Sequence, residues 1–278
     1  MKTTRTAFAL AAAVSLISPF LSAQTAPSDK DYFTVASEAS SLTASVPGGE
    51  AVPPVMPVAN TAAERGAPGG LVNAGMAAWS VINSGAPSGS YTSAYASAIP
   101  GFSFNWGNIS GWKGPKEMIY RYTVTNLMGV NVIDVKYKIS FYYGGTEDYG
   151  DAGGKAMSGY VAQATGGTTA RGDQKVHGHY ITNFTVQPVS VNIKWGWHFD
   201  LAVRMSDPMN IGTKLAPVAA LQASLNWIRS TPFSTNGGTL AYNVDGLGNF
   251  TDLTQQQRSL TKAIGPVEIP EAAPVKWD

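Results

Sequence analysis

The chain has 278 residues, of which 13% are charged and 44% are hydrophobic, and its formal net charge is +1. This balance supplies no electrostatic field that would attract nucleic acid, so a nucleic-acid-binding function is excluded. The absence of cysteine excludes disulfides, thiol catalysis and a lipid anchor on a cleavage-site cysteine. Enough apolar residues are present to fill a core, while the surface relies on Ser, Thr, Asn, Gln and Gly.

The first 23 residues have the pattern of a secretory signal peptide. Lys2 and Arg5 precede an apolar run over 7–17, and small residues lead up to Ala23. The run is too short to span a bilayer as a helix, and we expect cleavage near Ala23. Losing two basic residues lowers the net charge from +1 to −1. We therefore predict a secreted, periplasmic or cell-surface protein, and export without cysteine favours a bacterial one.

Residues 24–100 form a low-complexity stretch dominated by Ala, Ser, Gly, Pro and Thr. Such a composition buries too little apolar surface to offset the entropy of ordering the chain. The stretch is therefore predicted to be an extended or flexible arm. Within it, residues 71–82 are apolar enough to dock on the body as a short helix or strand.

From residue 101 the composition changes: aromatic residues become frequent, and apolar residues recur with a period of two. Residues 120–143 have the pattern of an antiparallel pair. Further strands are predicted at 156–164, 176–187, 189–205, 217–230 and 239–244. With no long amphipathic helix between them, they indicate an all-β antiparallel sandwich of about seven or eight strands, immunoglobulin-like or jelly-roll-like, over 101–255. Residues 256–278 are predicted to be a proline-containing tail on the surface.

The segment 189–205 has an apolar residue at every odd position, including Trp195, Trp197 and Phe199. Alternation places these side chains on one face, which we assign to the core. The segment is about twice as long as a usual strand. Gly196 offers a place where it can break into two.

The three histidines and one aspartate suggest a metal site. His177 and His179 are two residues apart in a predicted strand, so their rings leave the same face. His198 and Asp200 share a face of the next strand and supply the remaining ligands if the pairing brings them opposite. The alternative is that all four lie on ordinary solvent-exposed faces.

A second metal candidate is calcium, which prefers carboxylate and amide oxygens. Asp245, Asn249 and Asp252 fall at ligand spacings of a calcium loop, but the first carboxylate of such a loop is missing. A Gly-Asn turn between strands explains the same residues. The sequence indicates no other cofactor.

Aromatic residues outside the core register are candidates for a sugar-binding platform, since flat rings with polar edges stack on glycans. Each can equally be a partly buried residue at the rim of the core. They are Trp106, Trp112, Tyr142, Tyr149 and Tyr160.

No hydrolase elbow, zinc-protease helix or phosphate loop is present, so the sequence favours a protein that is not an enzyme. The leading hypothesis is a secreted structural, adhesive or ligand-binding β-sandwich that self-associates when its arm adds a strand to a neighbour. The alternative is a protein that inserts a β-hairpin, residues 168–187, into a membrane to form a pore. A third hypothesis is a polysaccharide-acting enzyme with two facing carboxylates.

Overall fold

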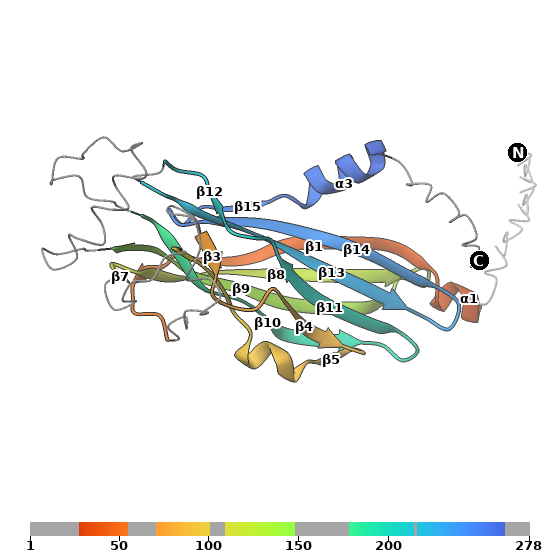
Figure 1. Cartoon of the computed structure of the whole chain (residues 1–278). Coiled ribbons are helices and arrows are strands. Elements are labelled where there is room, and N and C mark those ends of the chain that lie inside the picture. Colours follow the sequence, from red (N-terminus) through yellow and green to blue (C-terminus); the bar gives the residue numbers. More distant parts are fainter. Residues whose placement is uncertain (1–27, 55–70, 101–108, 148–177, 214–215, 265–278) are drawn as a thin grey trace, which may run out of the picture.

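The computed structural model describes residues 28–54, 71–100, 109–147, 178–213 and 216–264. They form two antiparallel sheets that pack face to face (Figure 1). The first sheet has the order β1 (Val35–Val46), β8 (Lys113–Asn126), β9 (Asn131–Glu147), β10 (Tyr180–Ile193), β6 (Ala96–Pro100) and β3 (Leu71–Asn73). In addition, β2 (Gly49–Glu50) pairs with β8, and β7 (Ile109–Ser110) pairs with β9.

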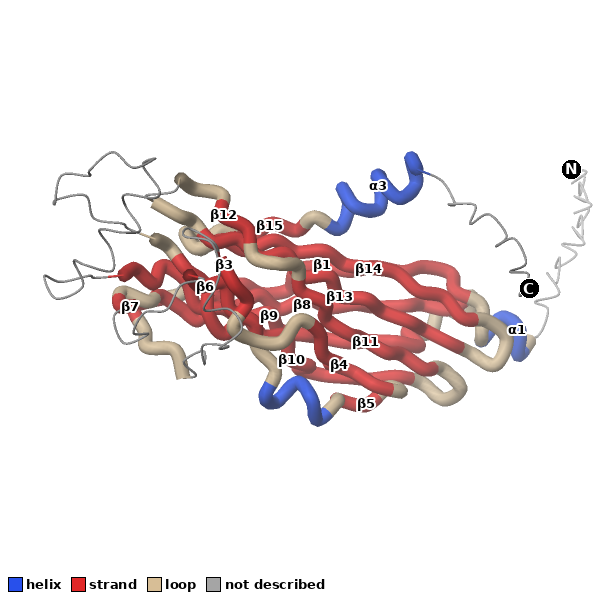
Figure 2. The backbone as a smooth tube through the Cα atoms, in the orientation of Figure 1, coloured by secondary structure: helices blue, strands red, loops and turns tan. Residues whose placement is uncertain are grey.

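The second sheet has the order β15 (Phe250–Asp252), β14 (Thr235–Asp245), β13 (Ala219–Ser230), β11 (His198–Met205), β4 (Ala78–Asn83) and β5 (Ala86–Pro87), and β12 (Met209–Asn210) pairs with β13. The helical elements are α1 (Asp29–Tyr32), η1 (Gly89–Ser93) and α3 (Thr254–Ile264). Figure 2 shows that they lie around a body made of strands. The predicted all-β antiparallel sandwich is confirmed.

The core lies between the two sheets and follows the period-two pattern. Inward side chains of β8 and β9 alternate with half-exposed ones, because successive residues of a strand point to opposite faces. The largest fully buried side chains come from both sheets, so each sheet buries one face against the other. They include Tyr122, Tyr137, Phe141, Phe184, Phe199 and Tyr242.

The segment predicted to be an arm contributes strands to both sheets: β1, β2, β3 and β6 to the first, and β4 and β5 to the second. The sandwich therefore begins at Val35 rather than at residue 101. Small residues here do not mean disorder. In β6, Ala96, Ser97 and Ala98 are fully buried, as is the larger Ile99, so a run of small residues can belong to a packed interior.

The segment 189–205 does break near Gly196, and its two halves belong to different sheets. Gly196 has a φ of +78°, and a Cβ there would clash with the Phe33 ring, so glycine suits the turn. The core assignment is confirmed for Trp197 and Phe199 but is wrong for Trp195, which is 83% exposed. The turn between the sheets interrupts the alternation at that position.

The predicted tail also begins with ordered structure, because residues up to Ile264 belong to α3. Thr254 starts this helix and is tied to β14, where its Oγ1 accepts a hydrogen bond from the Ala241 N–H at 3.1 Å. Proline first appears after it, at Pro266. Within the described part of the chain, no helix is long and apolar enough to cross a membrane. The predicted signal peptide and the predicted strand 156–164 lie outside the described residues.

Candidate functional site

The most unusual element of the sandwich is the edge strand β1. It pairs antiparallel with β8 from Val35 to Val46, yet none of its residues, all of which are described, is buried. Val35 and Glu38 are half-buried and the others are exposed. An edge strand of this kind is held mainly by its backbone ladder, since side-chain burial contributes little to its attachment.

Glu38 forms the ionic anchor of β1. Its carboxylate accepts a hydrogen bond from Nη1 of Arg229 on β13 and lies 3.4 Å from Nη2 of Arg258 on α3. The Glu38 and Arg229 side chains are 22% and 12% exposed, so the pair is largely shielded from water. One carboxylate therefore links the edge of the first sheet to the second sheet and to α3.

Two aromatic residues complete the surroundings of Arg229. Its guanidinium lies 5.1 Å from the centre of the Trp227 ring, in the range of a cation–π contact. Its Nη1 also lies 3.3 Å from the hydroxyl oxygen of Tyr122. Burial raises the pKa of Tyr122 above its usual range, and the nearby Glu38 raises it further. Tyr122 therefore stays neutral at physiological pH.

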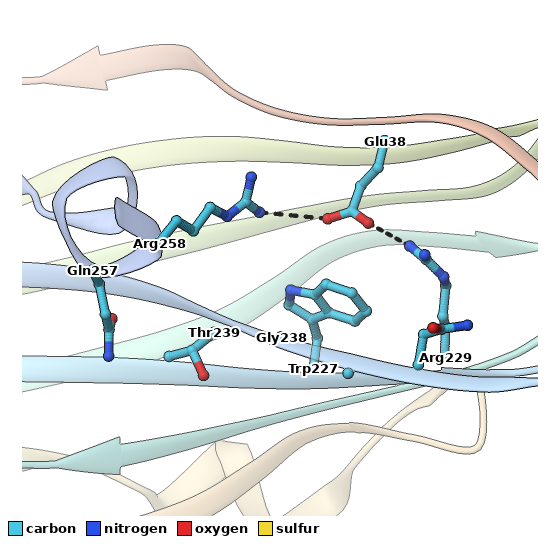
Figure 3. Close-up of a pocket in the computed structure, with 9 residues that line it drawn as sticks. Glu38, Trp227, Arg229, Gly238, Thr239, Gln257 and Arg258 are labelled. Carbon is cyan, nitrogen blue, oxygen red and sulfur yellow. Dashed lines mark hydrogen bonds and ion pairs between the residues drawn. The ribbon is translucent and has the colours of Figure 1, made fainter. Parts of the chain in front are cut away.

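Glu38, Trp227, Arg229 and Arg258 border a pocket of about 710 Å³ between β1, β13, β14 and α3. Figure 3 shows Trp227 between Glu38 and Gly238, with Arg229 and Arg258 reaching the same carboxylate from two elements. A Cβ at Gly238 would lie 2.5 Å from the indole, so glycine leaves the space that the ring occupies. We call this group of residues on β1, β13, β14 and α3 the β1 seam.

The β1 seam brings opposite charges together. Its two guanidiniums face a single carboxylate, which leaves one positive charge. The described residues that line the pocket include no histidine, cysteine, serine or aspartate. Their one hydroxyl is that of Thr239 and their one carboxylate is that of Glu38, so a pair of facing carboxylates is not found among them.

The structure places two of the predicted histidine ligands, His179 and His198, far apart. His198 pairs with Ser230 at one end of β13, while His179 bridges Val218, just before the other end. Twelve residues of strand separate these positions by about 40 Å. Asp200 is engaged elsewhere, because its Oδ1 accepts the Ser84 N–H at 2.5 Å.

His177 lies outside the described residues. Among those that the structure describes, no group of three or more His, Asp or Glu side chains converges on a metal position.

The predicted calcium ligands instead form hydrogen bonds within a turn and at the start of α3. Asp245 Oδ1 accepts the N–H groups of Leu247 and Asn249, each at 2.9 Å, and its Oδ2 accepts the Asn249 side-chain amide at 2.8 Å. Asp252 caps the start of α3 by accepting the Thr254 N–H at 2.9 Å. These bonds fit the turn that the sequence offered as the alternative to calcium.

The predicted sugar platform is wrong for Trp112, which is 5% exposed and packs against Gly145. Tyr142 is half-buried beside Gly114. The lack of a side chain at the two glycines makes room for these rings. The other three candidates, Trp106, Tyr149 and Tyr160, lie outside the described residues.

Sequence reasoning missed the β1 seam, although one signal was available. Arg229 continues the alternation of Leu225 and Trp227, so it is a charged residue on the core face of its strand. A buried guanidinium requires a partner. Its partner Glu38 is 191 residues away in the chain, and no local pattern connects them.

Comparison with protein-family models, with curated proteins and with solved structures found no match for this chain. Its function is therefore argued from its own residues.

Proposed function

We propose that this protein is an exported structural β-sandwich, without enzymatic activity, that self-associates by exchanging the segment α1–β1–β2 between copies. The observation that supports this most directly is that β1 is paired along its whole length but buries none of its side chains. Exchange of an identical element re-forms the same contacts in another copy and therefore costs little.

Beyond the backbone ladder, side chains of the segment contact the rest of the sandwich at several points. Phe33 packs against Trp197 and Phe233 at the start of β1, Glu38 pairs with Arg229 in the middle, and Thr43 Oγ1 donates to the Ile119 carbonyl at 2.8 Å near the end. Each of these contacts crosses from the segment to the rest of the sandwich. Each can form equally well with the body of a second copy.

The chain between Glu50 and Leu71 is long enough for exchange. Its 20 residues, 51–70, reach about 70 Å when extended, compared with about 40 Å for the twelve residues of β1. A tether of this length allows β1 to leave its own β8 and pair with that of a neighbour. The open edge of β1 also carries no lysine or proline, which are residues that commonly protect an edge strand.

The other two hypotheses gain less from the fold. The described part of the predicted membrane hairpin, from Gly178, belongs largely to β10, which lies inside the first sheet between β9 and β6. For polysaccharide chemistry, Glu38 is the one carboxylate among the described residues that line the pocket. Self-association is therefore the hypothesis that a particular element of the fold, the edge strand β1, supports.

A disulfide that fixes β1 to its own β8 tests the proposal. Ala39 and Thr123 are directly opposed, and opposed residues of antiparallel strands lie within disulfide range. Because the chain has no cysteine, Ala39→Cys with Thr123→Cys creates a single possible bond. A matched control, Ala202→Cys with Asn226→Cys, joins β11 to β13.

Light scattering after size exclusion gives the result. We expect concentration-dependent oligomers for the wild type and the control. The variant with Ala39→Cys and Thr123→Cys, which we call the β1 lock, should stay monomeric when its disulfide is formed in dilute, monomeric protein. Reduction of the lock restores the oligomers. A wild type that stays monomeric at millimolar concentration would refute the proposal, as would oligomers that the lock leaves unchanged.

A further inference from the structure

Exposed apolar side chains gather at one end of the sandwich. The turns β8–β9 (127–130), β10–β11 (194–197) and β13–β14 (231–234) all lie at this end, because β10 ends opposite the start of β9 and β11 begins opposite the end of β13. α1 lies there too, since the Leu127 N–H donates to the Thr34 carbonyl. We call it the turn end. Its exposed apolar side chains are Leu127, Met128, Val130, Trp195 and Phe233.

The Phe33 ring lies between two exposed aromatic side chains of the turn end, Trp195 and Phe233. Phe33 lies 6.3 Å from Trp195 and 5.3 Å from Phe233 between ring centres. Trp195 and Phe233 are 83% and 72% exposed, so the bulk of each ring projects into solvent. Exposed aromatic residues grouped in this way mark an interaction surface rather than a core.

The turn end carries no net charge. Among the twelve residues of the three turns, Lys194 is the one charged residue. α1 adds Lys30 together with Asp29 and Asp31, so the charges of the turn end balance. Such a surface gains nothing from the potential of an anionic membrane.

Several backbone groups of the turns are hydrogen-bonded within the protein. This matters for lipid, because polar backbone groups that approach hydrocarbon without partners are costly. A protein partner imposes no such demand, since it can supply hydrogen bonds of its own. The bonds are Phe233 N–H to Thr231 Oγ1 at 3.2 Å, Val130 N–H to Asn126 Oδ1 at 2.9 Å, Gly129 N–H to the Asn126 carbonyl at 2.9 Å and Tyr32 hydroxyl to the Trp195 carbonyl at 3.0 Å.

We propose that the turn end docks on the interface of a zwitterionic phospholipid bilayer, with Trp195 and Phe233 entering at the level of the headgroups. Tryptophan is favoured at this depth because its ring is apolar and its N–H is polar. The leucine, methionine and valine of the β8–β9 turn add apolar area beside them. The docking is peripheral and leaves both sheets intact.

Co-sedimentation of the full chain with phosphatidylcholine vesicles tests this. We expect binding that changes less than twofold when anionic lipid is added. Trp195→Ser with Phe233→Ser should weaken binding about tenfold or more, because it removes the two most exposed rings. The matched control, Met209→Ser with Ile211→Ser, removes two exposed apolar side chains at the opposite end, beside Ala219 and Ala220, and should bind normally.

Two further measurements separate peripheral docking from pore formation and from self-association. Trp195→Phe should keep binding but lose the blue shift in tryptophan emission that vesicles cause in the wild type. Encapsulated dye should stay inside the vesicles. Wild type that does not sediment with vesicles, or a turn-end variant that binds like its control, would overturn the proposal. Turn-end substitutions that dissolve an oligomer without affecting vesicle binding would assign the surface to a second copy instead.

Discussion

Replacing Glu38 with alanine perturbs the ionic anchor of β1. The substitution removes the charged partner from Arg229, whose side chain is 12% exposed, and leaves it the Tyr122 hydroxyl and the Trp227 ring. A hydrogen bond to a charged group contributes about 1.5–3 kcal/mol. Because Glu38 is partly in contact with water, we take a cost of about 2 kcal/mol. That cost raises the detached population of β1 about 30-fold.

Native-state hydrogen exchange measures this directly. Amide protons of β1 should lose protection about 30-fold in Glu38→Ala, while those of β13 and β9 change little. Glu50→Ala, which alters an exposed carboxylate on β2, serves as the control. Arg229→Met in the same chain as Glu38→Ala should recover part of the loss, since no buried guanidinium is left uncompensated. Unchanged protection of β1 in Glu38→Ala would refute the anchoring role.

Three further substitutions or conditions have defined outcomes. Burial raises the pKa of Tyr242 far above its usual value near 10. Above pH 10 the folded state therefore keeps a proton that the unfolded state loses. Unfolding followed by circular dichroism should show that Tyr242 lowers the free energy of unfolding by about 1.4 kcal/mol for each pH unit above 10. Gly238→Val places side-chain atoms against the Trp227 ring and should lower the free energy of unfolding in urea by about 1–3 kcal/mol. The hydrogen bond from Arg121 lowers the pKa of Asp134. This contribution to stability is present above about pH 4 and disappears as the pH falls further. Asp134→Asn should therefore reduce the loss of stability below about pH 4 in a plot of melting temperature against pH.

The central strands could be predicted because their environment is uniform. In β8, β9 and β13 one face is buried along most of the strand, so the apolar residues recur with a period of two. β1 has no such pattern, because its side chains remain exposed. Its strand conformation is decided by the unpaired backbone edge of β8, which is far away in the chain.

Distant contacts also account for the two wrong predictions at Trp195 and Trp112. Trp195 continues the alternation of its neighbours, but the chain is changing sheets there and the side chain points to solvent. Trp112 stands outside any alternating run, yet Gly145 on a neighbouring strand leaves space to bury it. Both outcomes depend on contacts between distant segments, which spacing along the chain does not encode.

The most direct test of strand exchange uses two singly substituted chains. One carries Ala39→Cys on β1 and the other Thr123→Cys on β8, two positions that are opposed in the ladder. Mixed at high concentration and oxidised, they should form a disulfide-linked heterodimer in excess over either homodimer, as seen by mass spectrometry and non-reducing electrophoresis. This result is expected if β1 pairs with the β8 of another copy. Statistical mixtures of the three dimers, or no cross-linking, would contradict exchange.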